Sequence, residues 1–279
     1  MKKQQYLLAI AGMLILTGLY FFGNTVSKSK PVNSPQRENS SQEKQLDISE
    51  ILQASESKLR PEQVGYVNRL KNAVVRGDVK NQQIKAFRQL ADFWKDSVQD
   101  AFLPSAYYEA ELAKLENSEK SLTFAAQLFL DNLRGQQPVF RNWMAAQAKE
   151  LFERALALNP QNDSARIGLG ATNIFGGGNV MQGVQQILEV SMRDSTNMYA
   201  QFMLALGGLE SGQFDKAIER LNKVVLHEPH NLEAILILAE AYEQKGDKSS
   251  AIRWYTAAKS GVNNQELIRE IDKRLKSLQ

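Results

Sequence analysis

A pattern of small and apolar residues recurs at a fixed interval in the carboxyl-terminal part of this chain. Its first copy comprises Leu204, Ala205, Gly212, Ala217, Leu221 and Val224, and its second comprises Leu238, Ala239, Gly246, Ala251, Tyr255 and Ala258, each 34 positions later. This period is typical of a repeated helix-turn-helix unit. Two short amphipathic helices cannot bury their apolar faces alone. The pattern therefore predicts helix pairs that stack on neighbouring pairs.

The composition permits such an array and excludes several classes of site. The chain has 279 residues, of which 43% are hydrophobic, so it can bury a sizeable core. Its 34 basic and 31 acidic side chains leave a net charge of only +3, which gives no strong attraction to nucleic acid. The absence of cysteine excludes disulfides, thiolate metal sites and a catalytic cysteine, but it does not determine the compartment.

Residues 1–23 predict a single membrane anchor. Lys2 and Lys3 precede a run from Tyr6 to Phe22 that carries no charge. As a helix this run is about 26 Å long, at the short end of what a bilayer core requires. A cleaved signal peptide, an uncleaved anchor and a buried core helix are the three interpretations. The polar segment that follows disfavours a core helix, and the lack of a small-x-small cleavage site favours an uncleaved anchor.

The orientation of this anchor is predicted from its basic leader. A short basic stretch before an apolar run resembles a bacterial signal anchor, although Lys28, Lys30 and Arg37 follow the run. We expect a single pass through the inner membrane, with the carboxyl-terminal domain in the periplasm. Residues 24–47 are rich in Ser, Asn, Gln and Lys and predict a disordered tether, because they carry too little apolar surface to offset the entropy of ordering.

Residues 48–117 predict a helical lead-in to the repeats. Their apolar stripes indicate a short helix after Asp47, a second from Pro61 to Gly77, a third over about 80–98 and a fourth from Pro104 to about Glu116. No clean repeat signal accompanies these helices. Whether they include one degenerate repeat is therefore left open.

Two stretches near the middle of the chain resemble the two helices of a tetratricopeptide repeat (TPR). They are Leu122-x2-Ala125-Ala126-x2-Phe129 and Ala148-x3-Phe152-x2-Ala155, the latter followed by Pro160. The resemblance implies an all-α, TPR-like α-solenoid of antiparallel helix pairs, preceded by the one N-terminal transmembrane helix. About four repeats fill residues 118–262, and residues 263–279 are predicted to form a capping helix, because their apolar residues share one side.

Comparison of the repeats predicts two insertions. Ala126 and Ala148 lie 22 positions apart, whereas the corresponding family positions lie 12 apart, so about ten extra residues are expected in a loop over 134–141. One further residue must fall between Gly170 and Gly183. We expect it in the triple glycine 176–178, because a glycine-rich turn tolerates positive φ angles.

No set of residues in the sequence indicates catalysis. His227 and His230 are the only histidines, and no third one completes a metal site. The Gly176-Gly177-Gly178-Asn179 stretch lacks the Gly-Lys-Ser/Thr of a phosphate-binding loop, and no Gly-x-Ser-x-Gly motif is present. We predict a non-enzymatic protein with no cofactor and no bound metal.

The TPR resemblance also implies a binding groove. In that family the first helix of each repeat lines a concave surface, through its second, fifth, ninth and twelfth positions. Here the groove would be apolar in its middle and acidic toward the carboxyl end. Where some family members clamp a terminal carboxylate with Lys and Asn, this chain has Phe202 and Leu206, which excludes such a clamp. The candidate protein-binding residues are Ile167, Ala171, Ile174, Tyr199, Phe202, Leu206, Leu209, Leu236, Glu240 and Glu243.

Together these features predict a membrane-anchored adaptor. It would act as a scaffold that binds a protein or peptide segment in its groove and aids the assembly of an envelope complex, with no nucleic-acid partner. One alternative is a homo-oligomeric structural module, in which the apolar first-helix face contacts a second copy of the chain. The other is an accessory factor in cytochrome c-type biogenesis, which is an analogy of architecture alone.

Overall fold

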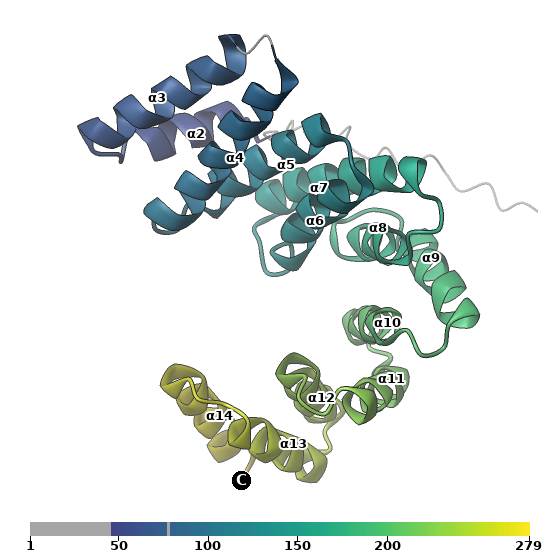
Figure 1. The fold of residues 1–279 in the computed structure, drawn as a ribbon. Coiled ribbons are helices and arrows are strands. Elements are labelled where there is room, and N and C mark those ends of the chain that lie inside the picture. The colour runs from purple at the N-terminus through teal and green to yellow at the C-terminus, as the bar shows by residue number, and fades with distance from the viewer. Residues whose placement is uncertain (1–45, 77–78) are drawn as a thin grey trace, which may run out of the picture. The chain divides into compact units, whose positions relative to one another are not determined.

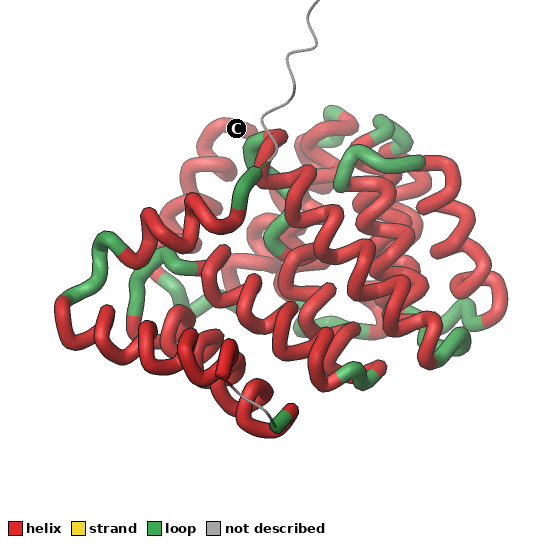
Figure 2. The backbone as a smooth tube through the Cα atoms, turned by 90° about the horizontal axis from the view of Figure 1, so that it is seen from above, coloured by secondary structure: helices red, strands yellow, loops and turns green. Residues whose placement is uncertain are grey.

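The computed structural model describes residues 46–76 and 79–279, which form helices joined by short loops, with no strand among these residues (Figures 1 and 2). The helices are α2 (Ile48–Glu56), α3 (Pro61–Arg76), α4 (Lys80–Ser97), α5 (Phe102–Glu116), α6 (Glu119–Asp131), α7 (Pro138–Leu158), α8 (Asp163–Phe175), α9 (Val180–Arg193), α10 (Met198–Glu210), α11 (Phe214–His227), α12 (Leu232–Lys245), α13 (Lys248–Ser260) and α14 (Gln265–Leu278). Within the described ranges no helix combines the length and the apolar character that a membrane span needs. The predicted anchor and all but the last two residues of the predicted tether lie outside these ranges.

A proline lies in the first turn of two helices in the lead-in. Pro61 opens α3, because its fixed φ suits the first helical position and its missing N–H would have no partner there. Pro104 was expected to open the next helix, but α5 begins two residues earlier, at Phe102. The first four N–H groups of a helix have no acceptor within it, so a proline is tolerated throughout that turn.

An asparagine caps α8, α10, α12 and α14 at their amino ends. The side-chain oxygens of Asn162, Asn197 and Asn231 accept hydrogen bonds from the backbone N–H three residues on, at 2.8 to 3.0 Å, and Asn264 caps α14 in the same manner. These four positions recur at nearly the repeat interval. The asparagines are therefore part of the repeat pattern. They were not among the residues from which the repeats were predicted, although their spacing is visible in the sequence.

The helices pack as consecutive pairs. The pairs are α4 with α5, α6 with α7, α8 with α9, α10 with α11 and α12 with α13, and each pair contacts the next (Figure 1). In addition α8 contacts both α6 and α10, so the first helices of three successive pairs form a layer of their own. The expected all-α, TPR-like solenoid of helix pairs is confirmed for the described residues.

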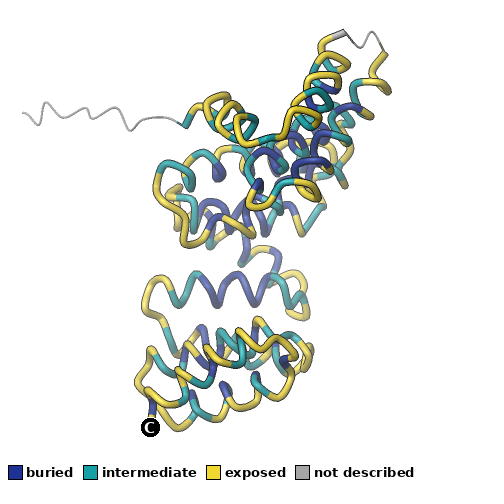
Figure 3. The backbone as a smooth tube through the Cα atoms, turned by 90° about the vertical axis from the view of Figure 1, so that its left-hand side faces the viewer, coloured by how far each residue is buried: buried dark blue, intermediate teal, exposed yellow. Residues whose placement is uncertain are grey.

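The buried side chains form three clusters along the array. Figure 3 marks the buried stretches along the backbone. Leu90 and Trp94 lie in the first cluster, which joins the helices from α3 to α5. Phe129 and Phe152 lie in the large central cluster, which runs from α5 to α12. Ile271 belongs to the third, where α14 covers α12 and α13. Within the predicted 263–279 segment, α14 spans Gln265–Leu278 and Asn264 is its N-cap.

Gly170 and Gly183 allow α8 and α9 to cross at close range. A Cβ atom on Gly170 would lie 2.7 Å from the carbonyl oxygen of Gly183, and one on Gly183 would lie 2.4 Å from the carbonyl oxygen of Gly170. The later repeats have Ala217 and Ala251 at the Gly183 position, and both are fully buried. A small residue is therefore required at this crossing in each repeat.

The predicted single-residue insertion lies in the triple-glycine turn. Leu169 and Leu204 each stand six residues before the end of their helix, but the following turn spans 176–179 in one repeat and 211–213 in the other. Gly177 takes a φ of +81°, which L-amino acids with side chains rarely adopt. The turn accommodates the extra residue without disturbing either helix.

The larger insertion is mostly helical, which corrects the expectation of a loop over 134–141. The connection after α6 spans only 132–137, and α7 begins at Pro138. Ala148 is the eleventh residue of α7, whereas Ala217 is the fourth residue of α11, so about two extra turns lengthen the start of α7. Trp143 in this extension packs edge-on against Phe129, with ring centroids 5.6 Å apart. That contact favours helix over loop here.

Candidate protein-binding groove

The layer of first helices carries a groove with a cavity volume of about 670 Å³ beside α10. Its lining includes apolar residues of α10 and four charged residues, from α6, the α6–α7 connection, the α11–α12 connection and α12. It is lined by Leu130, Asp131, Arg134, Phe175, Met198, Tyr199, Phe202, Met203, Leu206, Glu228, Asn231 and Glu233. We call this set the α10 groove.

A second hollow of about 680 Å³ adjoins the α10 groove at Tyr199. It is lined by the outer sides of α6 and the start of α8, including Lys120, Gln127 and Ser164. Phe124 also lines it and is 54% exposed, an unusual position for a large apolar ring. Among the described lining residues, Tyr199 is the one residue that lines both hollows.

A hydrogen-bonded chain links α10 to α6 at Tyr199. The hydroxyl of Tyr199 donates to Oε1 of Gln127 at 3.0 Å, and Nε2 of Gln127 donates to Oδ1 of Asp131 at 2.6 Å. Because a carboxylate only accepts, Asp131 requires the amide nitrogen of Gln127, and the amide oxygen is then left for Tyr199. Burial raises the pKa of Tyr199 to about 12, so its hydroxyl stays protonated and can donate at neutral pH.

Arg134 is held at the rim by two neighbours. Its guanidinium forms an ion pair with Glu210 at 3.5 Å, and its Cζ lies 5.5 Å from the ring centroid of Phe175. The contact with the ring is a cation–π interaction, which fixes the plane of the guanidinium. Arg134 therefore bridges the ends of α8 and α10 beside the groove.

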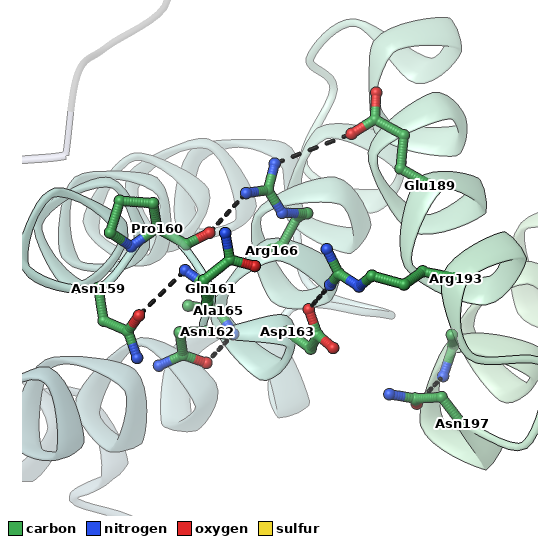
Figure 4. Close-up of polar contacts among 11 residues, drawn as sticks. Asn159, Pro160, Gln161, Asn162, Asp163, Ala165, Arg166, Glu189, Arg193 and Asn197 are labelled. Atoms are coloured by element: carbon green, nitrogen blue, oxygen red, sulfur yellow. Dashed lines mark hydrogen bonds and ion pairs between the residues drawn. The ribbon is translucent and has the colours of Figure 1, made fainter.

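A polar network fixes α8 relative to its neighbours (Figure 4). The guanidinium of Arg166 donates to the Pro160 carbonyl at 2.6 Å and pairs with Glu189 at 3.8 Å, and Arg193 pairs with Asp163. Arg166 thus connects α8 both to the turn before it and to α9, and the Arg193–Asp163 pair adds a second link between α8 and α9. Asn162 also donates to the Thr123 hydroxyl on α6 at 3.0 Å.

Three of the residues expected in the groove are brought together there. Tyr199, Phe202 and Leu206 line the α10 groove, with Tyr199 half-buried and the other two nearly covered. Ile174 lies at a separate hollow beside Arg134. That these residues bind a protein stays a prediction.

Ile167 and Ala171 do not reach the surface, and their assignment to the groove is corrected. Both are fully buried in the central cluster. The cause is the packing of α8 between α6 and α10, which covers the middle of α8 on both sides. Leu209 and Leu236 are half-buried and pack against the central and carboxyl-terminal clusters respectively.

The two acidic candidates on α12 differ in environment. Glu240 is exposed and accepts a hydrogen bond from Gln244 at 3.1 Å. Glu243 accepts from the Tyr255 hydroxyl at 2.8 Å and pairs with Arg274 at 3.5 Å, so it binds α13 and α14. The acidic groups that line the α10 groove are instead Asp131, Glu228 and Glu233. Glu233 stands at the second, groove-facing position of its repeat, whereas no repeat position predicts Asp131 or Glu228.

The parts of the chain that the structure describes contain no group of three or more His, Asp or Glu side chains placed to hold a metal ion. The site offers apolar surface, hydrogen-bonding groups and carboxylates. Apolar surface with a few hydrogen-bonding and charged groups is the chemistry by which proteins bind ligands non-covalently.

Comparison with known proteins gives a family match over part of the chain. The family model described as tetratricopeptide repeat matches residues 208–269, from the end of α10 into α14. Over these residues the chain is similar to tetratricopeptide repeats. No curated protein matches the sequence.

Solved structures of low sequence identity resemble the fold. One MamA crystal structure is 19% identical with a TM-score of 0.42, covering 65% of this chain and 92% of MamA. MamA 41-end from Desulfovibrio magneticus RS-1 is 20% identical with a TM-score of 0.42, covering 64% and 94%. YrrB, described as a TPR protein with an unusual peptide-binding site, is 14% identical with a TM-score of 0.40, covering 73% and 96%.

Proposed function

We propose that this protein is an adaptor that binds a segment of another protein in the α10 groove. The observation that supports the proposal is the apolar floor of that groove, formed by Phe202, Leu206 and their neighbours on the first-helix layer of a TPR array. A groove volume of about 670 Å³ accepts several side chains of a bound segment. Apolar pockets with a polar rim are the usual anchors of peptide recognition.

The proposal extends to the location of the adaptor. Residues 1–23 would anchor the protein in the inner membrane by a single pass, and residues 24–47 would tether the array in the periplasm. There the array would hold a subunit of an envelope complex during assembly. This part rests on the sequence of the amino-terminal segment, with its basic leader and charge-free run.

Site-specific crosslinking tests the groove. A photoreactive amino acid placed at Met198, which lines the groove on α10, should crosslink the full-length protein to a partner in cells. The matched control is Met192, which is 78% exposed on α9 and does not line the groove. Met198→Glu should then reduce recovery of the same partner, while Met192→Glu should not. Equal crosslinking from both positions, or none from Met198, would contradict the assignment.

Protease protection tests the topology separately. If the array is periplasmic, protease added to intact spheroplasts should digest the full-length protein to a short protected fragment. The same treatment should leave a cytoplasmic marker intact. Complete protection of the array until the membrane is lysed would exclude the periplasmic location, and it would leave the groove proposal standing.

A further inference from the structure

We propose that the segment bound in the α10 groove carries a Lys or Arg side chain next to a bulky apolar one, and that the basic group pairs with Asp131. This inference rests on the proposed function, because it names the chemistry of the partner at the same groove.

Asp131 lies at the rim of the groove without a counter-charge. Its side chain is exposed, and among residues 46–76 and 79–279 no basic group forms an ion pair with it. The nearby Arg134 is engaged with Glu210 and Phe175 instead. The carboxylate is therefore open to a cation that arrives from outside.

The hydrogen-bonded chain from Tyr199 orients this carboxylate. Gln127 binds Oδ1 of Asp131, and Gln127 is itself held by the Tyr199 hydroxyl, so the carboxylate is held in one orientation. Oδ2 has no such donor and remains to accept from an ammonium or guanidinium group. Tyr199 also lines the apolar floor, so a basic side chain at Asp131 places its neighbour on that floor.

The other charges around the groove favour the same partner. Glu228 and Glu233 stand on the α12 side of the groove, and Arg134 is the one basic residue among its described lining residues. Asn231 donates to Glu228 at 2.8 Å but brings no charge. An acidic segment would be repelled by three carboxylates, whereas a basic one is complementary to them. Although Asp131 is exposed at its outer side, partial desolvation by neighbouring residues raises the pKa of its carboxyl group above the ordinary value, and the hydrogen bond from Gln127 opposes this rise.

The first test is selection from a random peptide library displayed on phage. The bait is the full-length protein in detergent micelles, compared with its Asp131→Asn and Met198→Glu variants. Asn can still accept the hydrogen bond from Gln127, so the variant removes the charge with little change of structure. Glu219→Gln is the matched control, because Glu219 pairs with Lys223 on α11 and does not line the groove. Circular dichroism checks that each variant is folded.

The selected sequences separate the two proposals. We expect peptides enriched in Lys or Arg beside Leu, Ile, Phe or Met from the wild type and Glu219→Gln, and apolar peptides without the basic preference from Asp131→Asn. Peptides that depend on Met198 but show no basic preference would overturn this inference and leave the adaptor function intact. Selection that Met198→Glu does not alter would overturn both.

A binding measurement then isolates the ion pair. The peptide selected most often is synthesised with its basic residue present or replaced by norleucine, and both are titrated against wild type and Asp131→Asn. We expect norleucine to weaken binding about three- to tenfold on the wild type and to leave binding to Asp131→Asn nearly unchanged. An equal loss on both proteins would place the basic contact elsewhere and refute the role of Asp131.

Discussion

At the scale of single residues, the contact between Gly170 and Gly183 determines how closely α8 and α9 can pack. Each glycine faces the other's backbone carbonyl, which cannot move aside as the end of a flexible side chain can. Later repeats have a buried alanine at the position of Gly183. The crossing of α8 and α9 therefore leaves less room than the corresponding crossings in those repeats. Packing at such a site responds to the addition of a single methyl group.

We therefore expect Gly170→Ala to destabilise the array by about 1–3 kcal/mol, because its Cβ would meet the Gly183 carbonyl and Ile187 at 2.7 Å. The control is Gly65→Ala in α3, where no heavy atom lies within 4 Å of the new Cβ. That change should stabilise by about 0.5–1 kcal/mol, because alanine is the better helix former. Urea unfolding followed by circular dichroism measures both. A Gly170→Ala protein as stable as wild type would show that the crossing can widen freely.

At the scale of helices, the capping residues divide into neutral and ionisable groups. Asparagine caps the first helices α8, α10 and α12, as well as α14, and its hydrogen bond does not depend on pH. Asp247 caps α13 instead, accepting from the Ser250 backbone N–H at 3.0 Å and from its hydroxyl at 2.7 Å. These bonds, the backbone one first, hold the pKa of Asp247 below its ordinary value.

The lowered pKa of Asp247 predicts a pH-dependent contribution to stability. A carboxyl whose pKa is lower in the folded than in the unfolded state stabilises the fold above the unfolded pKa, and this contribution is lost as the pH falls through the folded pKa. Asp247→Asn keeps an acceptor for Ser250 but removes the titration. Its unfolding midpoint should therefore decline less than that of the wild type between about pH 5 and pH 2. Parallel pH profiles for the two proteins would contradict this role.

At the scale of the whole molecule, stability is expected to vary along the array. Most helices contact mainly the next one or two helices along the chain, so the ends have fewer partners than the middle. α2 buries no residue, and α14 buries only Ile271 and Leu278, whereas α8 and α10 are buried along much of their length. Local opening should begin at the ends.

Hydrogen exchange tests this gradient. Amides in α2 and α14 should exchange fastest and those in α6 to α10 slowest. Ile271→Ala removes a side chain that is 3% exposed in the carboxyl-terminal cluster. It should lower protection in α12 to α14 by up to about 2–4 kcal/mol and leave α6 to α9 unchanged. A uniform loss across all helices would show that the array opens as a single unit.

The sequence by itself determined the helix pairs and where most of them begin and end, because these depend on local chemistry. Apolar periodicity, Pro61 and the glycines at 212 and 246 act within a few residues, and both glycines adopt positive φ in the turns between paired helices. The 34-residue interval then predicted stacking, and the family resemblance selected Tyr199, Phe202 and Leu206 for the groove. The asparagine caps also depend on local chemistry, but they are polar and so do not belong to the pattern of small and apolar residues from which the repeats were predicted.

Only the tertiary structure decided which surfaces remain open and which groups meet on them. Ile167 occupies the same repeat position as Phe202, yet α6 and α10 close over it, and this depends on neighbours far along the chain. Tyr199 meets Gln127 across 72 residues of sequence, and their bond orients Asp131, which no repeat position predicts. Periodicity places a side chain on one side of its own helix. Its exposure and its partners are set by how the helices pack against one another.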